Sequence, residues 1–275
     1  MEFLIVDGKI YPEYEINLTQ IYRDETFRLS QSVWFGFGGI PLFEENIELL
    51  SEQISELKLI VPRELNSTRE LFRLTKRMLN KNKFYRSGLI HIVFIWGHNE
   101  IHSLISSEAF QTSDIPLRKE GLLLNYFKQK KYSQNIYNRY LFFSEMHWKV
   151  ALKEIENTIY QNTIIANEKE IVCECAFNNI YIIKGTKIFT PSLKTGCFED
   201  LTRNIILKIA TGINLKVEET DNLKVNDLFN ADEIFLASET NGIQWILGIE
   251  YKRFVHHYSI VIHRKLNEYL KEKVV

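Results

Sequence analysis

The stretch that decides the fold runs from Glu174 to Arg203 and has the sequence ECAFNNIYIIKGTKIFTPSLKTGCFEDLTR. Glu174 opens a segment of apolar residues that is typical of a buried strand, and Asn179 follows five positions later. A short hairpin and the Thr190-Pro191 corner come next, and Thr202-Arg203 stands at the start of a predicted helix. Polar and charged side chains therefore recur at the turns of one compact strand and helix unit, where binding chemistry is often found.

The hydrophobic pattern around this stretch predicts an α+β chain. The first half opens with a hairpin whose Asp7-Gly8 turn accepts positive φ angles. Further predicted strands are 27–37, 88–95, 164–166, 171–173, 177–183, 232–238 and 243–250, and predicted helices are 42–57, 68–79 (capped by Ser67 or Thr68), 144–158, 201–211 (stopping at Gly212) and 255–274.

The composition is that of an ordinary globular protein, with 275 residues of which 45% are hydrophobic and 25% charged. A formal net charge of −1 provides no electrostatic basis for binding nucleic acid or an anionic membrane. No apolar run approaches the ~20 residues of a membrane-spanning helix and no signal peptide is visible, so we expect a cytoplasmic protein. The three cysteines, Cys173, Cys175 and Cys197, fit no zinc or disulfide spacing and are expected to be small buried residues.

The ordered motifs resemble the fold-type IV enzymes that use pyridoxal phosphate (PLP), which include branched-chain and D-amino-acid aminotransferases and aminodeoxychorismate lyase. The resemblance covers most of the chain, weakly at the front and well from about Ser144 to Ile249. It implies a small N-terminal α/β domain, which we place at residues 1–128, and a larger β-barrel-like C-terminal domain with helices, at 129–275. The motifs that carry it are Glu174 with Asn179, Thr190-Pro191, Thr202-Arg203, and Asp232-Glu233 with Phe235.

The resemblance implies a carboxylate that pairs with the pyridinium nitrogen of PLP and a lysine that forms a Schiff base with it. Glu174 matches the carboxylate and is the first candidate catalytic residue. An ungapped count back from Glu174 places the lysine position at Tyr140 or Leu141, neither of which can form an imine. Lys149 is the fallback catalytic lysine, and Lys131 would require an insertion of several residues.

The resemblance also implies a phosphate site, and its residues differ in this chain. Leu49 stands where the family has an arginine, and it offers neither charge nor a hydrogen bond. The family's Gly-Ile-Thr turn reads Asp200-Leu201-Thr202, and Asp200 is expected to cap the helix and to accept from its free N–H groups itself. The residue on the opposite wall of this phosphate site is Glu239, or Thr240 if the alignment with the family shifts by one residue.

These differences predict a class IV aminotransferase-like or aminodeoxychorismate lyase-like protein with a degenerate PLP site. It would be a PLP-independent enzyme or a small-molecule binder that uses the interdomain cleft and needs no cofactor. One alternative is an active PLP-dependent aminotransferase or lyase with a displaced lysine, and another is a non-catalytic partner subunit, so whether it is an enzyme stays open. Besides Glu174, the expected cleft residues are Arg203, Thr202, Asp200, Glu239, Thr240 and Tyr140.

Two further questions concern metals and assembly. His98 and His102 have a spacing that would suit a metal only on a helix, and no third ligand is evident, so no metal site is predicted. The resemblance implies a homodimer, and the apolar residues Trp34, Phe35, Phe37 and 122–126 could form its contact. The alternative is that these residues complete the core of the monomer.

Overall fold

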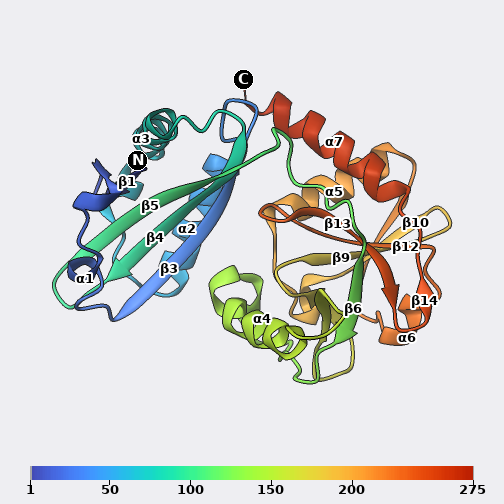
Figure 1. The fold of residues 1–275 in the computed structure, drawn as a ribbon. Coiled ribbons are helices and arrows are strands. Elements are labelled where there is room, and N and C mark those ends of the chain that lie inside the picture. The colour runs from blue at the N-terminus through green and yellow to red at the C-terminus, as the bar shows by residue number, and fades with distance from the viewer. Residues whose placement is uncertain (1, 275) are drawn as a thin grey trace. The chain divides into compact units, whose positions relative to one another are not determined.

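The computed structural model describes residues 2–274 and divides into two compact units. The first unit runs to Asp114 and takes in the chain again from Leu270, and the second runs from Ile115 to Tyr269 (Figure 1). The boundary therefore lies earlier than the predicted 128/129. The reason is strand β6 (Leu122–Tyr126), which pairs in parallel with two strands of the second unit.

The first unit is an antiparallel sheet of five strands in the order β2-β1-β5-β4-β3. Its hairpin turn has φ values of 49° at Asp7 and 77° at Gly8, as the Asp-Gly sequence predicts. Helix α2 packs against β3 and helix α3 against β1. Ser67 caps α3 by accepting from the N–H of Glu70. The elements are β1 (Phe3–Val6), β2 (Lys9–Pro12), α1 (Leu18–Ile21), β3 (Phe27–Phe35), α2 (Phe43–Glu56), α3 (Thr68–Asn82), β4 (Ser87–Trp96) and β5 (Ile101–Phe110).

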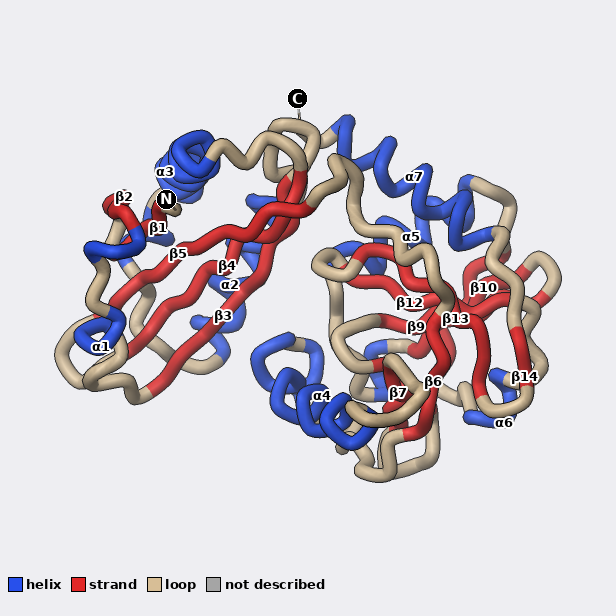
Figure 2. Tube along the Cα trace, in the orientation of Figure 1, coloured by secondary structure: helices blue, strands red, loops and turns tan. Residues whose placement is uncertain are grey.

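The second unit is built on a nine-stranded mixed sheet with the order β11-β10-β9-β12-β13-β6-β7-β8, and β14 pairs with β13 (Figure 2). Its strands after β6 are β7 (Asn162–Ala166), β8 (Val172–Cys175), β9 (Asn179–Lys184), β10 (Lys187–Pro191), β11 (Lys216–Thr220), β12 (Glu233–Ser238), β13 (Gly242–Ile249) and β14 (Lys252–Arg253). Its helices are α4 (Leu141–Ile155), α5 (Leu201–Gly212), α6 (Val225–Leu228) and most of α7 (Tyr258–Glu272), whose last residues from Leu270 belong to the first unit.

This sheet curls back on itself. Strand β8 ends the sheet, yet a tight turn joins it directly to β9 in the middle, and Cys175 and Asn178 exchange two backbone hydrogen bonds of 3.0 Å across that turn. Val172 on β8 and Ile182 on β9 share one core, and Phe189 on β10 packs against it. The predicted α+β class and the barrel-like second domain are thus confirmed.

Most predicted elements are present, and the exceptions have physical reasons. Strands β5, β6, β11 and β14 and the short helices α1 and α6 lie outside the predicted elements. Strand β5 is rich in serine, and β11 is a charged strand at the sheet edge. Helix α5 includes Gly212, and the left-handed residue beyond it is Asn214, with a φ of 64°.

The apolar residues expected at a dimer contact are mostly internal. Trp34 and Phe35 are 1% and 3% exposed, and Leu122 and Leu124 are 1% and 0% exposed. For these four residues the alternative is correct, because they complete the core of the chain.

The remaining general expectations concern cysteines, metals and membranes. The three cysteines are buried and free, as predicted. His102 bonds to Asp7 at 2.9 Å, and no cluster of three metal-binding side chains occurs between residues 2 and 274. Within the same range, none of the helices combines the length and the apolar character that crossing a bilayer requires.

Candidate functional site

Glu174 lies on β8, is 0% exposed, and has donors on both carboxylate oxygens. Oε1 accepts from the Lys131 ammonium at 2.8 Å and from the Trp148 indole N–H at 2.7 Å. Oε2 accepts from the backbone N–H of Phe198 at 2.6 Å. We call Glu174, Lys131, Trp148, Phe198 and Ser144, whose hydroxyl lies 3.0 Å from the Lys131 ammonium, the Glu174 cluster.

The cluster is assembled from segments that are distant in sequence. Lys131 follows β6, and its backbone N–H bonds to the carbonyl of Ala166 at 3.0 Å, which holds it beside the end of β7. Trp148 comes from α4, with the rings of Phe177 and Phe198 at centroid distances of 4.9 and 5.0 Å from its indole. These aromatic rings exclude water from the ion pair, so its charges interact strongly.

His147 is a neighbour of this cluster that the sequence analysis did not single out. Its ring lies 5.0 Å from that of Phe127. Burial lowers the pKa of His147, the positive charge of Lys131 lowers it further, and Glu174 opposes these effects. The imidazole is therefore neutral near pH 7.

Asp200 forms a second buried cluster at the N-terminus of α5. Its Oδ1 accepts from the N–H of Thr202 at 2.8 Å and from the hydroxyl of the same residue. The N–H of Glu239 lies 3.1 Å from both carboxylate oxygens. Burial raises the pKa of the Asp200 carboxyl, while the hydrogen bonds from Thr202 and Glu239 limit the rise. The predicted helix cap is confirmed, and Glu239 rather than Thr240 faces it; the Thr240 hydroxyl lies 3.4 Å from that of Ser238.

Arg203 is also internal, with 2% exposure. Its guanidinium donates to the hydroxyl of Thr190 at 3.1 Å, to the carbonyl of Pro191 at 2.7 Å and to Glu219 at 2.6 Å. These bonds tie α5 to β10 and β11. Arg203 was predicted to line a cleft, but the structure uses it to join elements of the second unit.

Two of the residues considered for the catalytic lysine position, Tyr140 and Lys149, have different surroundings. Tyr140 is 1% exposed and immediately precedes α4. Lys149 lies on α4 with 59% of its side chain exposed, and it pairs with Glu145 at 2.7 Å. The structure thus brings Lys131, not Lys149, to Glu174. The sequence signal for Lys131 was weak, since 43 residues separate it from Glu174.

Comparison with known proteins agrees with this architecture. The family model for amino-transferase class IV matches residues 70–249. The chain belongs to this family. A probable branched-chain-amino-acid aminotransferase of Aquifex aeolicus is 24% identical over 98% of this chain and 91% of that protein. The aminodeoxychorismate lyase of Bacillus subtilis is 29% identical over 45% of this chain, and the match spans only 41% of that enzyme.

Solved structures show that the class IV fold covers the whole chain. The branched-chain aminotransferase of Thermoproteus uzoniensis has a TM-score of 0.85 and 18% identity, over 99% of this chain and 95% of that one. A putative 4-amino-4-deoxychorismate lyase from Legionella pneumophila has a TM-score of 0.77 and 16% identity, over 91% and 93%. At these identities the likeness concerns the fold alone.

In this class IV chain the groups that the family resemblance assigns to PLP bond to one another. One oxygen of Glu174 accepts from both the Lys131 ammonium and the Trp148 indole N–H, so lysine and carboxylate are in direct contact. The amides at the start of α5 and at Glu239 bond to Asp200. A phosphate there would meet a buried carboxylate.

Proposed function

We propose that this class IV chain acts without PLP, as a cofactor-independent protein that binds a small molecule. The observation that carries the proposal is the direct contact of 2.8 Å between the Lys131 ammonium and the Glu174 carboxylate. The two side chains are 4% and 0% exposed. A ring that entered between them would have to separate this buried ion pair before it made contacts of its own.

The position of Asp200 supports the same proposal. A helix N-terminus with free N–H groups ordinarily attracts an anion. Here an internal carboxylate accepts from Thr202 and Glu239. At an effective dielectric constant of ~20, a second unit charge of the same sign at ~4 Å would be opposed by about 4 kcal/mol. Both ends of the implied cofactor site are therefore unfavourable for PLP.

A second candidate function is an active PLP-dependent aminotransferase or lyase, the activities named for the relatives. One observation favours it: Lys131 is a buried lysine directly beside Glu174. In that case Lys131 would leave the carboxylate and form the Schiff base. The two functions therefore make opposite predictions for the same amine.

The experiment is incubation of the purified protein with PLP, followed by an absorbance spectrum, borohydride reduction and peptide mass spectrometry. We expect no Schiff-base band and no reduced adduct on Lys131. The Lys131→Met variant is the matched control, because any band that persists in it comes from other lysines. A band that borohydride bleaches, with an adduct on Lys131 that is absent from the variant, would refute the proposal and establish the second function.

A further inference from the structure

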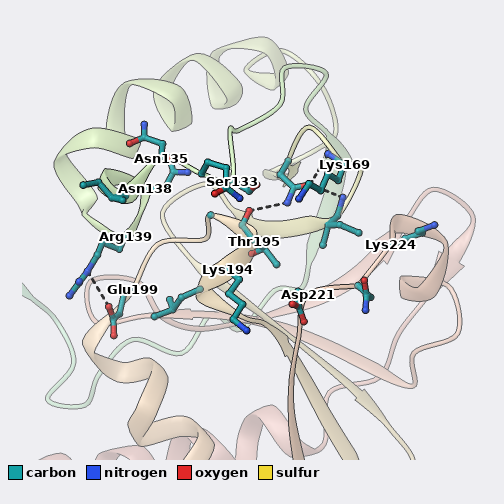
Figure 3. Close-up of a pocket in the computed structure, with 17 residues that line it drawn as sticks. Ser133, Asn135, Asn138, Arg139, Lys169, Lys194, Thr195, Glu199, Asp221 and Lys224 are labelled. Atoms are coloured by element: carbon teal, nitrogen blue, oxygen red, sulfur yellow. Dashed lines mark hydrogen bonds and ion pairs between the residues drawn. The ribbon is translucent and has the colours of Figure 1, made fainter.

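A pocket of about 930 Å³ opens on the second unit, and all of its lining comes from that unit (Figure 3). It lies between four segments, residues 133–139, 167–171, 193–199 and 221–224. Its volume falls in the range of ~300–1,000 Å³ that is usual for small-molecule sites. None of its lining residues belongs to the Glu174 cluster.

The walls of this pocket are bonded to one another. The backbone N–H and hydroxyl of Ser133 donate to Glu168 at 2.8 and 2.6 Å. The Asn167 amide donates to the carbonyl of Thr195 at 3.0 Å, which joins two walls. Gly196 has a φ of 86°, and a Cβ there would lie 2.8 Å from the Asn138 amide nitrogen. The lining is therefore closely packed, and the site is largely formed before a ligand arrives.

The charges around the pocket favour an anion. Lys169, Lys194 and Lys224 each come from a different segment, and none has an ion pair within residues 2–274. Arg139 pairs with Glu199 at 3.5 Å, Asp221 is the other carboxylate of the lining, and the Glu168 carboxylate bonded to Ser133 lies beside Lys169. An excess of positive charge results, although the whole chain has a net charge of −1.

The rest of the lining indicates an organic ligand. Ile136 and Leu193 expose 68% and 40% of their surface and provide apolar contacts. Amide side chains such as Gln134 and Asn222 can bond to hydroxyl or carbonyl groups. We infer that this pocket binds a small organic anion that carries two or more negative charges as phosphate or carboxylate groups.

This inference goes beyond the proposed function and does not depend on it, since the two sites share no residue. An anionic ligand would bind at the exposed ammonium groups of the lysines. At physiological ionic strength, salt screens the attraction between such exposed charges beyond about 8 Å. Affinity should therefore weaken as salt increases.

The test is isothermal titration with two probes, pyrophosphate and citrate, in 0.15 M NaCl. We expect saturable binding of at least one probe, and the stronger one identifies phosphate or carboxylate as the preferred group. In the variant Lys169→Glu/Lys194→Glu, the affinity should fall at least about tenfold. Lys208→Glu is the matched control, because Lys208 is exposed on α5 and does not line the pocket.

Three outcomes would overturn the inference. They are no saturable binding of either probe to the unmodified protein, unchanged affinity in the double variant, or an equal loss in Lys208→Glu. All three substitutions are at exposed positions, so the folded state is retained and can be verified by circular dichroism. The PLP experiment detects an imine at Lys131, whereas the titration measures anion binding at the pocket. Either result can therefore be negative without affecting the other.

Discussion

Lys131→Met should destabilise the protein far more than Lys149→Met, although both lysines contact a glutamate at nearly the same distance. The Lys131–Glu174 contact is 2.8 Å with side-chain exposures of 4% and 0%, and the Lys149–Glu145 contact is 2.7 Å with exposures of 59% and 31%. Methionine preserves most of the apolar stem in each case. The difference between the variants therefore measures the effect of burial.

The magnitude follows from the geometry. Two unit charges at the 2.8 Å of the buried pair attract by about 6 kcal/mol at an effective dielectric constant of ~20. Removing Lys131 leaves the Glu174 carboxylate buried with only the Trp148 and Phe198 donors, which should cost about 3–5 kcal/mol of unfolding free energy. The exposed i,i+4 pair of Lys149 should contribute only about 0.3–0.5 kcal/mol.

The assay is urea unfolding at pH 7, followed by tryptophan fluorescence and circular dichroism. The double variant Lys131→Met/Glu174→Gln should recover part of the loss, because the unpaired charge is gone while one hydrogen bond stays broken. If Lys131→Met costs no more than Lys149→Met, the ion pair does not stabilise the second unit and the main argument against PLP is lost.

Three other predictions use different residues. Asp200→Ala removes the α5 cap and should lower the unfolding free energy by about 1 kcal/mol, measured in the same urea assay; no loss would show that the cap is dispensable. The lowered pKa of His147 means that the folded protein binds its proton less tightly than the unfolded chain, so stability should decrease as the pH falls below about 6.5. His147→Leu should reduce that decrease, and identical pH profiles would contradict this assignment. Finally, we predict a homodimer in light scattering at micromolar concentration, and a monomer mass would exclude it.

Local signals predicted much of this chain, whereas long-range pairing was not predictable. The cap at Asp200 follows from a short polar residue directly before an apolar helix, and the hairpin turn from Asp7-Gly8, so both depend on neighbouring residues only. The partner of Glu174 depends on β6 pairing in parallel with β7, which brings Lys131 to β8. The bonding partners of Arg203 were not predictable for a similar reason, since its acceptors lie on strands whose register no local pattern reveals.

The carboxylate of Asp200 is a tethered competitor for any free anion. Because it belongs to the same chain as the amides of Thr202 and Glu239, its effective concentration there is in the millimolar range or higher. A dissolved phosphate ion of equal intrinsic affinity would have to exceed that concentration before it displaced the side chain. Aspartate and glycine codons differ by a single nucleotide. One point mutation, Asp200→Gly, would therefore remove the carboxylate that accepts from the N–H groups of Thr202 and Glu239. This single substitution would leave these amides at the start of α5 without their carboxylate acceptor.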